Sequence, residues 1–207
     1  SNKISDKEVS GLGDTKVNAL YEIFNDGNGR VQLNAGVSLP TGDIKRDNNG
    51  VRQSYGMQLG SGSYEALPGI SYTGYKNYYS YGAQANAIFR LNSNNVGYKL
   101  GDSYNLTAWA ARKLNDAFSL SYRVNYTITE SIKGTDKDLN LAMSPSHDSL
   151  SGGRRLDLLL GTNFIVPNGY FKGNRLALEG GMPVYQNLNG TQLETDYKIT
   201  LGWQKTF

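Results

Sequence analysis

The amino-acid sequence predicts an all-β protein, an antiparallel transmembrane β-barrel, and three observations support this fold class. Apolar and polar residues alternate one by one along most of the chain, which is the period of a β-strand. No segment keeps apolar residues at helical spacing for long. Alternating stretches such as 79–91 exceed the strands of soluble sheets, which average about five or six residues. They suit strands that cross a bilayer at a tilt, which need roughly 9 to 11 residues.

The composition excludes several other classes of protein. The chain has 207 residues with 25 Gly, 15 Tyr and no Cys, and 38% of it is apolar. The lack of Cys excludes disulfide scaffolds, thiolate metal sites and cysteine nucleophiles. The apolar share is below the roughly 45–50% of ordinary globular proteins, so a large dry core does not organise this chain. No apolar run reaches the roughly 18 residues of a spanning helix, which excludes a helical membrane protein.

The charges give no sign of a nucleic-acid partner. The 21 basic and 18 acidic residues are interspersed along the chain and leave a net charge of +3. No Lys/Arg block is dense enough to follow a phosphate backbone. The chain begins SNKISDKEVS without a Met or an apolar segment, so a signal peptide is either already removed or was never part of it. The location must therefore be inferred from the strands.

The alternation predicts nine strands. The clearest is 31–39, in which every odd residue is apolar and every even residue is polar or Gly. The stretch 79–91 also has its apolar residues at odd positions, with Ile88 as the exception, and 118–128 has them at even positions. The last seventeen residues alternate as well, with most apolar residues at odd positions. Turn residues separate the stretches. The predicted strands are 16–24, 31–39, 54–75, 79–91, 103–113, 118–128, 153–167, 175–186 and 191–207.

The stretch 54–75 is ambiguous because its apolar phase changes. Tyr55 and Leu59 are apolar at odd positions, whereas Ile70 and Tyr72 are apolar at even positions, and the change falls at 60–63. A Gly-rich bulge within one long bent strand would do this. A hairpin turn between two shorter strands would do it too.

The connections between strands differ in length in a regular way. Outer-membrane barrels have short periplasmic turns and longer external loops. One bent strand at 54–75 puts all the short turns on one side and all the long loops on the other, so we prefer it. The short connections are 25–29, 74–77, 113–116 and 167–174, and the long ones are 40–52, 92–102 and 130–152.

The count of nine strands has a consequence, because bacterial single-chain barrels have an even number of strands. We expect residues 1–207 to form a single barrel domain that lacks an odd number of N-terminal strands, most simply three. The whole barrel would then have about 12 strands. The alternative is a ten-stranded barrel in which the segment 60–63 is a true turn.

The apolar face of each strand is expected to face lipid. A soluble β-sandwich would also alternate, with the apolar face as its core. Strand length, the terminal Phe207 and aromatic residues near strand ends favour a membrane barrel. An apolar outer face in hydrocarbon requires a closed sheet, because every backbone polar group must be paired within the protein. The aromatic residues are Tyr21, Phe24, Tyr79, Tyr104, Phe118, Phe164 and Trp203.

Several motifs resemble a family of Gram-negative outer-membrane proteins named for the meta-pathway of phenol degradation. They are GLGD (11–14), LPTGD (39–43), QLGSGS (58–63), YKLGD (98–102), SGGRRL (151–156) and MPVYQNLNGTQL (182–193), followed by the final GWQKTF. The motifs consist of Gly, Pro and strand ends, so they are specific for fold and weak for substrate. The resemblance implies transport of small, aromatic or apolar molecules across the outer membrane. It also implies that the barrel assembly machinery reads the C-terminal strand ending at Phe207.

The predicted inward face carries the candidate lumen residues, six basic and five acidic. They either form a paired ion network that fills a narrow lumen or make a polar constriction that orients a solute, with Arg123, Arg155 and Glu194 as the best candidates. The near balance of charge predicts weak ion selectivity. Trp109 should also point inward, where its indole either stacks on a solute or fills space. The eleven charged residues are Lys16, Glu22, Arg90, Arg123, Arg155, Asp157, Arg175, Glu179, Glu194, Asp196 and Lys198.

Catalytic and metal sites are not predicted. The one His, His147, has Asp148 and Ser149 beside it, but consecutive loop residues seldom converge as a hydrolase triad. Asp136 and Asp138 lack the Gly and terminal Glu of a calcium loop. No cofactor is expected.

The sequence as a whole favours an outer-membrane channel for passive uptake of small molecules and not an enzyme. The expected partners are outer-membrane lipid, a small solute and the assembly machinery. The alternatives are a non-conducting barrel whose long loops bind a partner or stabilise the envelope and, as a third reading, a membrane hydrolase.

Overall fold

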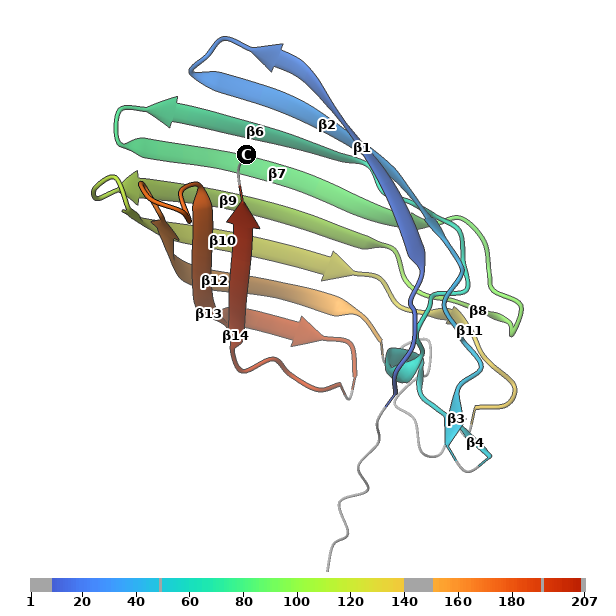
Figure 1. Ribbon diagram of the computed structural model, residues 1–207. Helices are drawn as coiled ribbons and strands as arrows, with labels where there is room; N and C mark the ends of the chain where they lie inside the picture. The colour runs from blue at the N-terminus through green and yellow to red at the C-terminus, as the bar shows by residue number, and fades with distance from the viewer. Residues whose placement is uncertain (1–8, 49, 140–150, 191, 206–207) are drawn as a thin grey trace, which may run out of the picture.

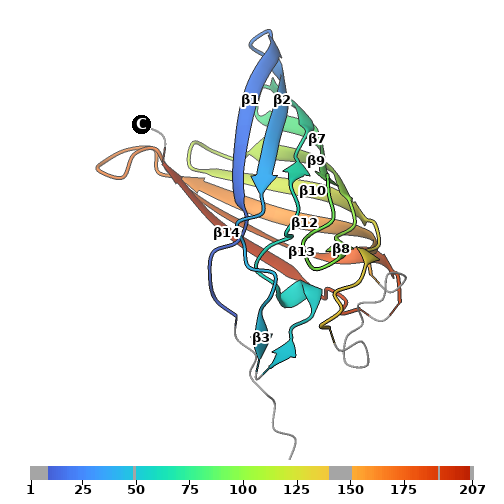
Figure 2. The same ribbon diagram turned by 90° about the vertical axis from the view of Figure 1, so that its right-hand side faces the viewer.

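The computed structural model describes residues 9–48, 50–139, 151–190 and 192–205, and its main feature is one strongly curved antiparallel sheet (Figures 1 and 2). Its strands follow one another around the curve in chain order. They are β1 (Thr15–Asn25), β2 (Gly29–Leu39), β5 (Glu65–Ala66), β6 (Gly69–Lys76), β7 (Tyr79–Arg90), β9 (Ser103–Lys113), β10 (Phe118–Thr129), β12 (Gly153–Ile165), β13 (Asn174–Leu188) and β14 (Lys198–Lys205).

The sheet has nine strand positions, as predicted, because β5 and β6 are two pieces of one strand. Both pieces pair with β2 on one side and β7 on the other. Pro68 lies in the gap between them and has no N–H to donate to the ladder. β1 and β14 are the two edges of the sheet and do not pair with each other among the described residues.

The expectation of one bent strand over 54–75 is wrong, and so is the ten-stranded alternative. Only residues 65–66 and 69–76 of this stretch belong to the sheet, and Tyr55–Met57 form a short 3-10 helix, η1, outside it. The apolar phase changes because Tyr55 belongs to a packed loop cluster, in which it is buried. Gly60 lies against Gly42, where an added Cβ would be 2.7 Å from a backbone oxygen, so the segment is a tight loop crossing.

The final strand is also shorter than predicted. β14 begins at Lys198, and the chain before it leaves the ladder because Thr195 exchanges hydrogen bonds with the Gln186 side chain instead. Residues 206–207 and therefore Phe207 lie outside the described residues. The other strands agree with the prediction to within about two residues at most ends.

The connections are sorted by length as expected. The short turns lie at one end of the sheet, and the long loops gather at the other end (Figure 1). The long loops carry their own small elements, which are η1, β3 (Asp47–Asn48), β4 (Val51–Arg52), β8 (Tyr98–Lys99) and β11 (Lys133–Gly134). We call this loop cluster, within residues 40–64, 91–102 and 130–139, the cap. In the described part of the chain, no helix is long and apolar enough to cross a membrane.

The two faces of the sheet have inverted burial. Val37 and Leu120 are 50% and 52% exposed, and none of the described residues form a second sheet or a helix that covers their face. Ser38 and Asp157 point to the concave side and are fully buried. The apolar face is therefore the convex outer surface, and the polar face is the inner wall, which is the arrangement expected for lipid outside and water or solute inside.

Candidate functional site

The inner wall is built by strand register, which brings alternate residues of neighbouring strands together on the concave side. Trp109 on β9 lies opposite Gly82 on β7 and Arg123 on β10. A Cβ at Gly82 would be 2.4 Å from the Trp109 ring, so the missing side chain makes room for the indole to lie against the wall. The Arg123 guanidinium lies 5.7 Å from the ring centroid. Trp109 is thus held as part of an Arg–Trp pair.

Arg123 also joins the wall to the next strands. Its Nε donates to Oε2 of Glu179 on β13 at 2.9 Å, across β12. Both side chains are partly open to the lumen, with 36% and 22% of their surfaces exposed. Trp109, Arg123 and Glu179 therefore form one aromatic and ionic group on the inner wall.

A second group centres on Asp157 of β12, which is fully buried. Its Oδ2 accepts from Lys198 Nζ on β14 at 2.5 Å and from Asn125 Nδ2 on β10 at 3.4 Å. Its Oδ1 lies 3.0 Å from Arg155 Nε, an ion pair without the alignment of a hydrogen bond. Arg155 Nη1 donates to Thr195 Oγ1 at 2.9 Å. Two cations thus share one buried carboxylate.

Arg90 forms a third ionic group near the cap. Its Nε lies 3.1 Å from Oε1 of the buried Glu65, which the register of β5 and β7 places opposite it. Its guanidinium also donates to the Gly101 carbonyl, and its backbone N–H donates to Asp102. This group ties the inner wall to the loop that precedes β9.

Five of the eleven charged lumen residues predicted from the sequence lie apart from these groups. Glu194 and Asp196 precede β14, are exposed, and make no ion pair within the described part of the chain. Thr195, between them, is the residue that contacts the wall. Lys16 and Glu22 are exposed on the edge strand β1, and Arg175 binds Asn163 through Nε and Nη2 at 2.9 and 2.6 Å.

Sequence reasoning missed the uncharged polar residues of the wall. Asn105 Nδ2 donates to Asn125 Oδ1 at 2.8 Å and to Thr127 Oγ1 at 3.1 Å, which connects β9 to β10 and, through Asn125, to Asp157. Glu65 was also missed. The sequence does place these amides on the alternating polar faces of neighbouring strands, but the prediction considered only the charged residues of those faces.

The cap closes on a small apolar core of its own. Tyr55 and Tyr98 stack with ring centroids 4.2 Å apart, and Leu139 completes the buried cluster. Arg52 pairs with Asp136 at 3.1 Å and Asp138 at 3.0 Å, so these two carboxylates bind a guanidinium. Burial, reinforced by the neighbouring Tyr55, raises the pKa of Tyr98 to about 12. His147 lies outside the described residues.

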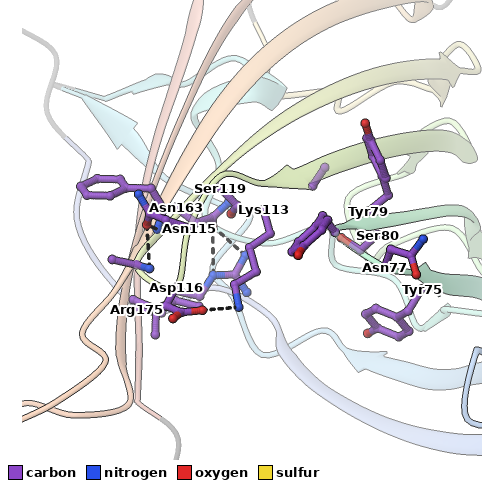
Figure 3. A pocket seen from close by; sticks show the side chains of 15 residues that line it. Tyr75, Asn77, Tyr79, Ser80, Lys113, Asn115, Asp116, Ser119, Asn163 and Arg175 are labelled. Atoms are coloured by element: carbon purple, nitrogen blue, oxygen red, sulfur yellow. Dashed lines mark hydrogen bonds and ion pairs between the residues drawn. The ribbon is translucent and has the colours of Figure 1, made fainter.

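A pocket of about 300 Å³ lies at the opposite end, among the short turns (Figure 3). Tyr75 and Tyr79 line one side of it, and Lys113 and Arg175 the other. Lys113 donates to Asp116 at 2.8 Å and lowers the pKa of that exposed carboxyl. Since Ser80 and Ser119 of the inner wall also line it, the pocket opens on the concave side of the sheet.

A comparison with models of protein families identifies the family of the chain. The family model described as "Putative MetA-pathway of phenol degradation" matches residues 1–180. The chain belongs to this family. Its membership confirms the resemblance seen in the motifs. Among curated proteins, no sequence matches the chain.

A solved structure has the same fold. The crystal structure of the COG4313 outer membrane channel from Pseudomonas putida F1 is similar to this family member with a TM-score of 0.67 at 14% identity. The similarity covers 94% of this chain and 66% of that chain, so the chain spans about two thirds of the channel's length. The predicted fold class, an antiparallel transmembrane β-barrel, is confirmed. Family and fold together support the bacterial outer membrane as the location.

Proposed function

We propose that the protein is an outer-membrane channel for passive uptake of small molecules, with aromatic or apolar compounds as the substrate class. The observation that carries the proposal is the inverted sheet, in which apolar residues such as Leu120 face outward and buried polar residues such as Asp157 line the inner wall. The family and the fold of the COG4313 channel support a channel or transporter over an enzyme.

The partners of the protein belong to the same proposal. About three further strands would close the sheet between β1 and β14, and outer-membrane lipid would cover the convex face. The C-terminal strand would be read by the barrel assembly machinery.

Within the lumen, Trp109, Arg123 and Glu179 form the proposed contact for a solute. One face of the indole lies against Gly82 and the guanidinium lies near the ring. The exposed edges of this group offer an aromatic surface and hydrogen-bond donors together. Arg90, Arg155, Asp157 and Lys198 serve mainly to keep the wall paired. Glu194 and Asp196 would act at the approach to β14.

Conductance and liposome swelling of the full-length protein test the channel. We expect passage with weak ion selectivity, because carboxylates balance most cations on the wall. A strong anion or cation preference would contradict this account of the lumen.

The solute contact is tested by Trp109→Ala, with Trp203→Ala on the lipid face as the matched control. We expect Trp109→Ala to change permeability for a small aromatic solute severalfold and for a non-aromatic solute of similar size much less. Equal changes for both solutes would mean that Trp109 only fills space.

A second candidate is a non-conducting barrel that stabilises the envelope or binds a partner through its loops. The packed cap favours it, because the long loops share a buried core and so form an ordered surface on which a partner would bind. Silence in both assays, from protein shown to be folded, would favour this second function over the first.

A further inference from the structure

The lipid-facing surface is hollowed by a groove of about 790 Å³ that crosses β2, β6, β7, β9 and β10. The groove floor is made by Ala85 and Ala87 of β7. Strand register places Leu33 and Ile70 beyond Ala85 on one side and Leu106 on the other. These residues point outward, away from the lumen wall described above. The groove is therefore a feature of the membrane-facing surface.

The strand break explains why the surface is hollow at this point. Pro68 occupies the gap between β5 and β6, and its carbonyl accepts the Ala87 N–H at 3.0 Å. No long side chain projects outward from Pro68 or from Ala87. Phe89 and Tyr104 close the end of the groove nearest the cap, with their rings edge to face at 5.8 Å.

A cation lies beside the groove on the same outward face. Arg154 is opposite Ile128 in the β10–β12 register, and Ile128 lines the groove. Arg154 is exposed and has no carboxylate partner in the described part of the chain. It is the second residue of β12, at the end of the strand nearest the cap. An arginine on the lipid face is tolerated near the interface, where its guanidinium reaches the headgroups.

We propose that the groove binds an acyl chain of a phosphorylated lipid of the outer leaflet and that Arg154 binds the phosphate. The inference rests on the proposed outer-membrane location, which puts this face in lipid. The groove offers almost no hydrogen-bond partners, so it suits a hydrocarbon chain better than a peptide backbone, which would need them. The arginine supplies the donors that match a phosphate.

The test uses the full-length protein extracted in detergent and stripped of lipid, with lipid A as the probe in native mass spectrometry. Ala87→Phe fills the groove. Ala110→Phe makes the same change on the same outer face but outside the groove, opposite Tyr81 and Tyr122. We expect Ala87→Phe to weaken lipid A binding roughly tenfold or more, because the new ring displaces an acyl chain from the groove. We expect Ala110→Phe to leave lipid A binding unchanged.

The headgroup contact is tested with Arg154→Gln. This variant should bind lipid A roughly tenfold more weakly and bind lipid A without phosphates as well as the wild type does. Equal lipid A binding by the wild type and all the variants would mean that the lipid binds nonspecifically and would overturn the proposal. A wild-type dimer that Ala87→Phe abolishes, with lipid binding unchanged, would overturn it by identifying a second copy as the occupant. Retention of the heat-modifiable, folded form on gels shows that each variant is folded.

Conductance of the same samples separates this proposal from the proposed function. If the wild type does not conduct but its lipid A binding is weakened by Ala87→Phe and not by Ala110→Phe, the channel is refuted and the lipid-binding groove is supported. If the wild type conducts and both variants bind lipid A as tightly as it does, the lipid-binding groove alone is refuted.

Discussion

The cap and the barrel wall organise the same kinds of residue in opposite ways. In the cap, Tyr55, Tyr98 and Leu139 are buried together, as in a soluble protein. In the wall, Leu120 lies outside and Asp157 is buried. Both regions obey the same physical rule, because apolar groups leave water and buried polar groups find partners. The difference teaches that the surroundings of each region, water or lipid, decide which face of a pattern becomes the interior.

The largest expected effect lies in the cap. Tyr98→Ala removes a fully buried ring and should destabilise the cap by about 3–5 kcal/mol, the usual cost of a large-to-small core change. Hydrogen exchange of residues 50–57 and 98–100 should rise strongly. Tyr81→Ala, on the lipid-facing wall, is the control, and protection of the cap should be unchanged in it. Equal loss of protection in both variants would mean that cap and wall unfold together.

The wall should respond most to the loss of its buried carboxylate. Asp157→Asn leaves Arg155 and Lys198 without a counter-charge, which we expect to cost about 2–3 kcal/mol, since both cations are partly exposed. Urea unfolding in detergent, followed by gel mobility, measures this cost. Asp116→Asn breaks an exposed pair at a turn and should change nothing measurable. An unaltered Asp157→Asn protein would show that water solvates the inner wall freely.

A charge placed on either face of one strand tests the inversion directly. Leu120→Arg points into lipid and should destabilise the folded barrel by about 1–2 kcal/mol, because it lies toward the end of the strand. Ser121→Arg, the next residue, points into the lumen and should be tolerated better. Folding yield in lipid vesicles provides the measurement. If Ser121→Arg were the more damaging change, the faces would be assigned the wrong way round.

The smallest expected effect is a loosening of the cap at high pH. The folded pKa of Tyr98, about 12, is above the ordinary value of 10. The stability that goes with the neutral phenol is therefore fully present below pH 10 and is lost as the pH rises toward 12. Cap protection from proteolysis should fall over this window. In Tyr98→Phe, which keeps the ring but cannot ionise, this part of the fall should disappear.

Regular strands were predictable because the two-residue alternation of apolar and polar residues continues over many residues. The ends of β7 and β9 lie within about one residue of their predicted positions. The stretch 54–75 failed for the opposite reason. Tyr55 and Leu59 alternate with polar residues as in a strand, but the burial of Tyr55 depends on Tyr98 and Leu139, which are distant in the sequence. A local pattern cannot carry that information.

The candidate site was predictable in part. Alternation placed Trp109, Arg123 and Asp157 on the inner face, and the structure pairs each of them across strands. Alternation also put Glu194 and Asp196 on that face, but it assumed that the strand continued through them. The role of Gly82 could not be predicted, because only the register puts it under the indole.

Local chemistry in the sequence by itself determined the all-β class, the length of most strands, the sorting of short turns from long loops, and the polar character of one face. These follow from nearest neighbours along one strand. Tertiary structure alone decided which carboxylate meets which cation, where the strand breaks at Pro68, and how three loops share one core. Each of these depends on the register between segments far apart in the chain, and register is set by the packing of the whole sheet.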